Sequence, residues 1–299
     1  MIVELLHRAI RLRFHRLGFR SRILPLENCR IHYYQRTACG TGTPIVFLHG
    51  LGTSSSTWIK ILPLLPRAQS ITCVDLPGHG FSRITSGEPF FPMNRLDAVL
   101  EQWFDRTQTA PVLLVGHSLG GWLAARFALR HPRSVRRLVL INAAGIHYPG
   151  AEKQAEAFTL KRTADARRLL DLLWYRYPWY FKPFTGGVFH SMQKRSIASF
   201  VASVRPDDFI NHSLPELTPA LDVIWGEEDR LTDVQSADII RGLLPNAGVH
   251  RVPKCGHVPQ LERPRLLAPL LRDIIHTSAS DESAGGREAP DCTGGGTSK

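Results

Sequence analysis

Short apolar runs alternate with helical patterns along most of the chain, and this alternation restricts the fold more than any other feature. The apolar runs, each of a length suited to one strand, are 23–26, 31–34, 44–48, 71–75, 111–115, 138–141, 221–225 and 249–252. Apolar residues with helical spacing occupy 56–65, 93–106, 119–131, 233–243 and 264–276. Continuous apolar strands separated by helices are typical of a mostly parallel central sheet with helices on both faces. We therefore expect an α/β core that comprises residues 21–144 and 219–276.

The alternation is interrupted once, between residues 145 and 218. This segment holds 12 of the 26 aromatic residues of the chain, many of them in the run 174–184. A helical segment inserted after the sixth strand predicts a lid, although the aromatic residues also suit a small core of the segment's own. The last residues, 277–299, are rich in Gly, Ser and Thr and lack an apolar pattern. We expect them to form a disordered tail.

The net charge of +11 is concentrated at the N-terminus, where residues 1–36 hold eight arginines and two glutamates. Residues 1–20 place apolar side chains on one stripe, which predicts an amphipathic basic helix. Two interpretations stay open: the helix contacts an anionic membrane surface, on the inner face, or it packs on the body of the protein. Glu4, His7 and Arg8 interrupt the apolar run that a secretory signal needs, and the chain lacks the roughly 20 consecutive apolar residues of a membrane span.

Other binding functions find little support in the sequence. The five cysteines, at positions 29, 39, 73, 255 and 292, have neither a disulfide nor a metal-ligand spacing, which favours a reducing, cytoplasmic location. The glycine patterns of dinucleotide and phosphate loops are missing, so we expect no cofactor and no metal. Nucleic-acid binding is excluded because no dense basic patch or binding motif accompanies the charge.

The motif GHSLGG at 116–121 lies between an apolar strand and a helical pattern. A sharp strand-to-helix turn would hold Ser118 with its hydroxyl exposed, and Gly116 and Gly120 would leave room for this turn. The helix that follows would direct its N-terminal N–H groups toward developing negative charge. This context predicts a nucleophilic serine at position 118.

A serine nucleophile needs a base and a carboxylate that orients the base. His257 follows the last strand and Asp229 follows the preceding one, so both should lie with Ser118 at the carboxyl edge of the parallel strands. Glu227 and Glu228 are alternative acids near Asp229. Asn142 ends another strand at this edge, but an amide cannot stabilise an imidazolium ion.

The motif HGLG at 49–52 follows the strand at 44–48. Its glycines let the backbone approach a substrate closely. The N–H groups of Leu51 and Leu119 are therefore candidates for an oxyanion hole, whose individual donors are typically worth about 10²–10³ in rate.

These motifs together resemble the α/β-hydrolase fold family over residues 25–276. The resemblance is carried by HGLG, DLPGHG at 75–80, GHSLGG, WGEEDRL at 225–231 and CGHVPQLE at 255–262. Within the family, the inserted segment and the basic N-terminus are most similar to lipases and esterases of the monoacylglycerol-lipase type. The resemblance implies that His49 and His79 tie loops by hydrogen bonds and that His117 is a candidate substrate contact.

The family resemblance and the serine at the turn imply an acyl-enzyme mechanism. We expect a carboxylic ester hydrolase acting on a small lipophilic ester, because the inserted segment is rich in aromatic residues. A C–C bond hydrolase, a thioesterase, an amidase or a ligand-binding protein with low turnover would share Ser118, Asp229 and His257. C–C hydrolases of this family carry a longer Gly-Pro loop where this chain has residues 51–54, LGTS.

Overall fold

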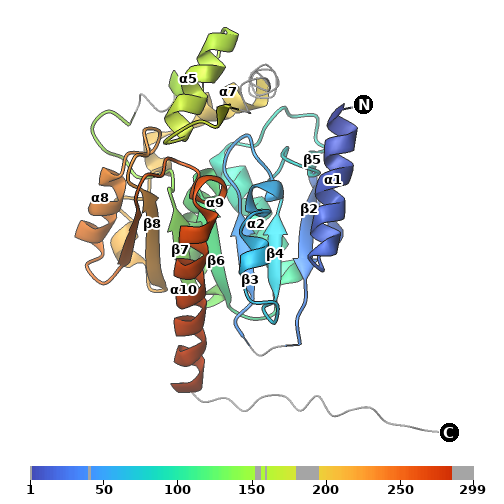
Figure 1. Cartoon of the computed structure of the whole chain (residues 1–299), viewed down its shortest axis with the longest axis vertical. Coiled ribbons are helices and arrows are strands. Elements are labelled where there is room, and N and C mark those ends of the chain that lie inside the picture. Colours follow the sequence, from blue (N-terminus) through green and yellow to red (C-terminus); the bar gives the residue numbers. More distant parts are fainter. Residues whose placement is uncertain (1, 40–41, 152–155, 159, 180–194, 285–299) are drawn as a thin grey trace, which may run out of the picture.

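The computed structural model describes residues 2–39, 42–151, 156–158, 160–179 and 195–284. One sheet runs through the molecule in the order β1-β2-β4-β3-β6-β7-β8-β9, and the short β5 pairs with β2 (Figure 1). The strands are β1 (Arg20–Pro25), β2 (Cys29–Arg36), β3 (Ile45–Leu48), β4 (Ile71–Val74), β5 (Arg83–Ile84), β6 (Val112–His117), β7 (Val135–Ile141), β8 (Ala220–Gly226) and β9 (Gly248–Val252). From β4 to β9 all neighbouring strands are parallel, whereas β1, β2 and β5 pair antiparallel. The mostly parallel sheet expected from the apolar runs is confirmed.

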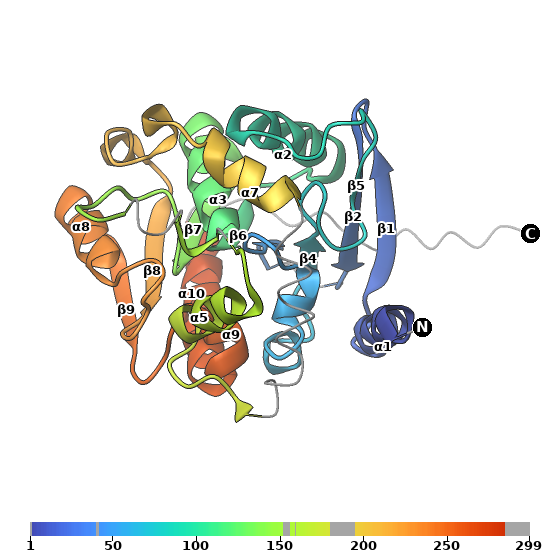
Figure 2. The same cartoon turned by 90° about the horizontal axis from the view of Figure 1, so that it is seen from above.

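Two layers of helices cover the sheet, one on each face (Figure 2). One face packs against α2 (Met93–Thr107), α3 (Leu119–Arg130) and α8 (Gln235–Leu243) through a core that includes Trp103, Leu123 and Ile240. The other face packs against α10 (Pro264–Ala284) and the loop segment that carries Trp58. Every residue of β3, β4 and β6 is buried, because these central strands are covered on both sides.

The predicted helix at 56–65 is wrong. Two short 3₁₀ helices, η1 (Ser55–Trp58) and η2 (Leu62–Leu64), take its place. Proline at position 63 lacks the N–H that a continuous α-helix would use, and this missing bond disfavours an α-helix through this segment. The apolar residues of this segment nevertheless face the core, where Trp58, Ile61 and Leu62 are all buried.

The start predicted for the disordered tail is also wrong. Helix α10 continues to Ala284, so residues 277–284 are helical, and residues 285–299 lie outside the described part of the chain. Thr277 and Ser278 donate their hydroxyls to the carbonyls of Asp273 and Ile274, at 2.9 and 2.8 Å. Both hydroxyls are thus bonded within the helix, where they do not compete for the backbone groups that continue it.

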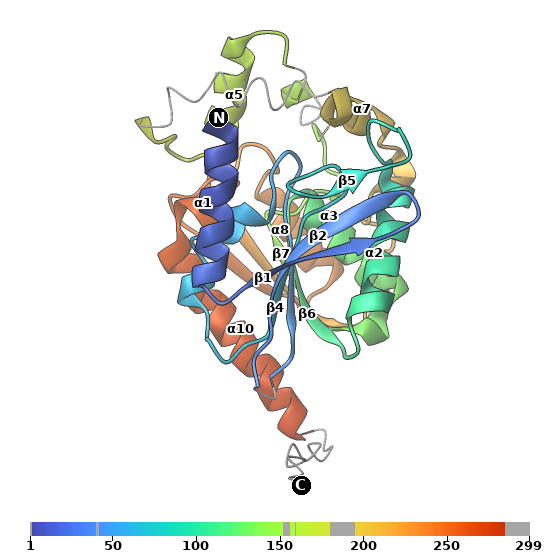
Figure 3. The ribbon, with the colours of Figure 1, turned by 90° about the vertical axis from the view of Figure 1, so that its right-hand side faces the viewer.

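The N-terminal residues form α1 (Ile2–Arg16), which packs beside the outer strands (Figure 3). Phe14 is fully buried and its ring stacks on Tyr34 with centroids 3.8 Å apart. The guanidinium of Arg11 lies 4.2 Å from the centroid of the Phe81 ring. The second half of the helix therefore packs on the body, while contact with a membrane stays a prediction. None of the helices in the described residues is long and apolar enough to cross a membrane.

The segment 145–218 leaves the sheet after β7. This is the sixth strand expected from the sequence, since the two-residue strand β5 was not predicted. Its described elements are α5 (Thr163–Leu173), α7 (Arg195–Ser203), η5 (Pro206–Asp208) and η6 (Leu214–Glu216). In Figure 1, α5 and α7 lie above the carboxyl ends of the strands. Tyr180, Phe181, Phe184 and Phe189 lie outside the described residues, and the lid role of the segment stays a prediction.

Candidate active site

Ser118 lies at the turn between β6 and α3, with φ 52° and ψ −120°. A non-glycine residue in this region stores about 1–3 kcal/mol of strain, which persists where the surroundings enforce it. A Cβ atom at Gly116 would collide with the backbone of Gly120, and one at Gly120 would collide with the backbone of Leu48 and His49. Close packing of the turn thus explains both glycines and holds Ser118 in its unusual conformation.

The amides of Leu51 and Leu119 make no hydrogen bond to another described residue. Both residues line the same cavity as Ser118. The loop that carries Leu51 is held by His49, whose Nε2 accepts from the N–H of Leu76 at 3.0 Å. The proton is therefore on Nδ1, which donates to the carbonyl of Gly50 at 2.8 Å. Two unpaired donors beside the serine are the arrangement that an oxyanion hole requires.

His257 and Asp229 form a buried pair at the carboxyl edge of the sheet. The Nδ1 atom of His257 lies 2.8 Å from Oδ2 of Asp229. Asp229 follows β8 and His257 follows β9, so two neighbouring parallel strands bring them together. The described residues include no hydrogen bond between Ser118 and His257, whose Nε2 is left available; such bonds are often long before a substrate binds.

Asp229 accepts more hydrogen bonds than its partnership with His257 requires. Asn142 Nδ2 and Thr232 Oγ1 each lie 2.6 Å from Oδ2 of Asp229, and the N–H groups of Leu231 and Thr232 reach Oδ1 at 2.8 and 3.0 Å. Burial alone raises the pKa of the Asp229 carboxyl, but the charge of His257 and these hydrogen bonds outweigh it and lower the pKa. The carboxylate is therefore ionised and fixed in orientation.

Sequence reasoning missed two of these contacts. It set Asn142 aside as an amide, yet Asn142 tethers Asp229 and accepts from the N–H of Gly226 at 3.3 Å. It overlooked Thr232, whose hydroxyl also lies 3.0 Å from Nδ1 of His257. A hydroxyl three residues after an acid in a turn is the one signal that could have indicated it. The alternative acid Glu228 instead accepts from the N–H groups of Lys254 and Cys255.

His117 lies behind the serine and is not among the residues that line the cavity. Its Nε2 donates to the carbonyl of His257 at 2.8 Å. Burial first, and then the charge of His257, lower the pKa of His117 to about 3, so the ring is neutral. The structure thus does not support the predicted substrate contact and places His117 where it positions the His257 backbone. His79, predicted to tie a loop, lies with Nδ1 2.9 Å from the carbonyl of Pro77.

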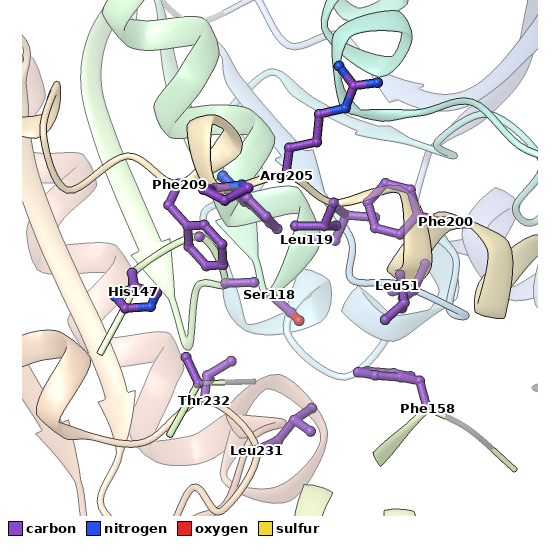
Figure 4. A pocket seen from close by; sticks show the side chains of 17 residues that line it. Leu51, Ser118, Leu119, His147, Phe158, Phe200, Arg205, Phe209, Leu231 and Thr232 are labelled. Atoms are coloured by element: carbon purple, nitrogen blue, oxygen red, sulfur yellow. The ribbon is translucent and has the colours of Figure 1, made fainter. Parts of the chain in front are cut away.

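The hydroxyl of Ser118 faces a cavity of about 450 Å³, a size that suits a small organic ligand (Figure 4). Phe158, Phe200 and Phe209 of the inserted segment form much of its wall, together with Leu51, Leu119, Trp122, Val201, Val204 and Leu231. The polar side chains that line it are Ser118, His147, Arg205 and Thr232. Such a wall favours an apolar ligand next to the serine.

A second chain of Ser, His and Asp hydrogen bonds lies elsewhere. Ser21 Oγ is 2.8 Å from Nε2 of His32, whose Nδ1 is 2.8 Å from Oδ2 of Asp75. Burial raises the pKa of Asp75, but the bond from His32 and neighbouring groups outweigh it and bring the pKa to about 2. Ser21 lies within the edge strand β1 and pairs with Tyr34 of β2, so it is not at a strand-to-helix turn like that of Ser118. We assign this chain a structural role.

Comparison with known proteins agrees with this architecture. The model of the alpha/beta hydrolase family matches residues 45–270, which is most of the chain. The chain belongs to the alpha/beta hydrolase family. The matched range includes Ser118, Asp229, His257 and the loop of Leu51.

Two curated relatives from this hydrolase family illustrate its range. Monoacylglycerol lipase ABHD6 of Homo sapiens is 24% identical, over 87% of this chain and 83% of its own length. 2-Hydroxymuconate semialdehyde hydrolase of Pseudomonas sp. strain CF600 is 27% identical, over 79% of this chain and 88% of its own. Among solved structures, a membrane phospholipase A described as a bacterial virulence factor is 23% identical and superposes with a TM-score of 0.77, covering 93% of this chain and 92% of its own. This last likeness shows the shared fold.

Proposed function

We propose that this protein is a serine hydrolase that cleaves lipophilic carboxylic esters through an acyl-enzyme on Ser118. As a member of a hydrolase family with lipase relatives, the chain is a hydrolase of esters. The observation that carries the assignment to Ser118 is its place in a strained turn, facing an apolar cavity that Leu51 and Leu119 also line, and the amides of both make no hydrogen bond to another described residue. Asp229 and His257 are the acid and base of the proposed catalytic triad.

The proposed reaction proceeds in two halves. His257 removes the proton of Ser118 through Nε2 as the serine oxygen attacks the ester carbonyl, and the amides of Leu51 and Leu119 stabilise the oxyanion. The alcohol leaves with the proton from His257, and the acyl group stays on Ser118. Water then attacks the acyl-enzyme, again with His257 as the base. Asp229 holds the imidazole in the tautomer that exposes Nε2 and stabilises the imidazolium.

The substrate class follows from the wall of the cavity. Aromatic and aliphatic side chains surround Ser118, so an acyl chain can leave water as it binds. Several relatives are named monoacylglycerol lipases. We therefore propose a small lipophilic ester of the monoacylglycerol type as substrate, with segment 145–218 as the lid.

Labelling with a fluorophosphonate reagent tests the nucleophile. The wild type should be labelled at Ser118 and should hydrolyse p-nitrophenyl esters, and Ser118→Ala should lose both properties. Ser21→Ala is the matched control, because it removes a serine from the other Ser–His–Asp chain and should change neither. Full ester hydrolysis by Ser118→Ala would refute the mechanism. A folded wild type that is not labelled would favour a ligand-binding protein with low turnover.

A second candidate function is hydrolysis of a C–C bond. One relative at 27% identity is named 2-hydroxymuconate semialdehyde hydrolase, and Arg205 and His147 line the cavity as groups that could bind an acid. The loop at 51–54 lacks the Gly-Pro sequence of such enzymes, which favours esters. If the protein hydrolysed a ring-cleavage product faster than all the esters tested, hydrolysis of a C–C bond would become the preferred function. Thioester and amide substrates belong in the same comparison.

Contact of residues 1–20 with an anionic membrane is a separate proposal. Phe14 fixes α1 to the body, while Arg8, Arg13 and Arg16 are exposed. In Figures 1 and 3 the N-terminal end of α1 points to the same side as α5. The wild type should sediment with phosphatidylglycerol vesicles and not with phosphatidylcholine vesicles. Replacing the three arginines with glutamine should abolish this difference, and unchanged sedimentation would contradict the proposal.

A further inference from the structure

A second, smaller pocket adjoins the main cavity. Its volume is about 30 Å³, compared with about 450 Å³ for the cavity that Ser118 faces. The two share three lining residues, Leu51, Leu119 and Phe200. Leu51 and Leu119 carry the amides that we assign to the oxyanion. The two spaces are therefore neighbours, separated by the residues that line both.

The small pocket is suited to hydrocarbon. Its wall is built from Ile84, Pro89, Phe90, Phe91, Leu96 and Ile197, together with residues of the 77–79 loop. The imidazole of His79 is part of this wall, but its Nδ1 already lies 2.9 Å from the carbonyl of Pro77. An apolar group entering the pocket would thus leave no charged side chain of this wall unpaired.

Phe200 is the shared wall that belongs to the inserted segment. It lies in α7 and is 6% exposed, and Figure 4 shows its ring beside Leu51 at the edge of the main cavity. The backbones of Leu51 and Leu119 are constrained by the packed turns around Gly50 and Gly120. Of the three residues that line both spaces, Phe200 has the largest side chain and is the one that lies outside the packed turns around Ser118.

We propose that Phe200 limits the length of the acyl chain by closing off the small pocket, whose apolar wall would otherwise serve as a subsite for further carbons of the chain. The inference rests on the proposed ester hydrolysis and deepens it. With Phe200 in place, the chain is limited to the main cavity. A smaller residue at this position joins the two spaces and lets a longer chain bind. Each methylene that then leaves water improves binding about fourfold, so three of them amount to about 60-fold at best.

A chain-length series of p-nitrophenyl esters, from butyrate to palmitate, tests the subsite. For Phe200→Ala we expect the ratio of kcat/KM for laurate over butyrate to rise at least about tenfold, because part of the ideal gain is lost to ordering the chain. Phe200→Leu should give a smaller rise and Phe200→Trp a fall. Val201→Ala is the comparison variant, because Val201 lies next in α7 and lines only the main cavity of the two, so its replacement enlarges that cavity without opening the small pocket. Its ratio should therefore rise less than that of Phe200→Ala.

An unchanged ratio in folded Phe200→Ala, or an equal rise in Val201→Ala, would overturn the proposal. Should Phe200→Ala not fold, Phe200→Leu and Phe200→Trp decide, because the subsite requires them to move the ratio in opposite directions. Binding gives an independent reading: in a Ser118→Ala background, fatty acids from hexanoate to palmitate displace a fluorescent fatty acid, and Phe200→Leu should shift the preference to longer chains. A wild type that hydrolyses no ester refutes the proposed function, whereas an unshifted binding preference refutes the subsite.

Discussion

Replacing Thr232 with valine removes one hydroxyl and keeps the branched shape of the side chain. In the wild type this hydroxyl donates to Oδ2 of Asp229 at 2.6 Å, and it lies 3.0 Å from Nδ1 of His257. Both Thr232 and Asp229 are buried, so water cannot replace the lost donor. A hydrogen bond to a charged group is worth about 1.5–3 kcal/mol. We expect the free energy of unfolding of Thr232→Val to fall by about this amount at neutral pH.

The same change should slow the reaction. Asp229 keeps its bonds from Asn142, Leu231 and the backbone of Thr232, so the carboxylate stays in place but the His257 ring loses one of its constraints. If half of the bond energy acts on the ring in the transition state, the barrier rises by about 0.75–1.5 kcal/mol, and kcat/KM falls about 3.5- to 13-fold. Thr232→Ser retains the hydroxyl and should retain most of the activity.

The pH dependence of stability separates the hydroxyl from packing. The pKa of Asp229 is lowered in the folded state, so its contribution is present above the ordinary value of 3.8 and is lost as the pH falls through the lowered pKa. Removing the Thr232 hydroxyl raises that pKa. The stability difference between wild type and Thr232→Val, from urea unfolding, should therefore be largest at neutral pH and shrink in acid. A difference that does not change with pH, or equal activity losses in the valine and serine variants, would refute this reasoning.

Three further outcomes are expected. The free energy of unfolding of Gly116→Ala, from urea denaturation, should be lower than that of the wild type by about 1–3 kcal/mol, because the new Cβ collides with the backbone of Gly120. An unchanged urea midpoint would contradict this prediction. Asp75→Asn should cost about 3–5 kcal/mol at neutral pH. Since the pKa of Asp75 is about 2 in the folded protein, the stability that the ionised carboxylate contributes to the wild type should be lost as the pH falls from about 3.8 through about 2. If the free energy of unfolding of both proteins changed equally over this pH range, the prediction would be wrong. Phe14→Ala should lower thermal stability by about 3 kcal/mol by removing the ring stacked on Tyr34, and an unchanged Tm would show that α1 is not anchored there.

The amino-acid sequence was sufficient to predict most of the sheet and the edge at which the candidate site lies. The central strand β3 is apolar along its whole length, and β6 is apolar from Val112 to Val115, because helices cover both sides of the sheet, and this leaves a local pattern that can be recognised in the sequence. Parallel strands place all their carboxyl ends at one edge. The positions of Ser118, Asp229 and His257 directly after strands were therefore enough to bring them to that edge.

The groups that complete the site could not be predicted, because they come together through contacts between distant segments. Asn142 is far from Asp229 along the chain, so no local periodicity reveals that their side chains meet. The role of His117 depended on which way its ring turns beneath the serine, and the docking of α1 depended on Phe14, which lies outside the stripe seen in the sequence. Phe200 became a boundary between two pockets because α7 packs above the loop of Leu51. Side-chain contacts between distant segments form only when the core closes, and they are what distinguishes this site from the bare motif.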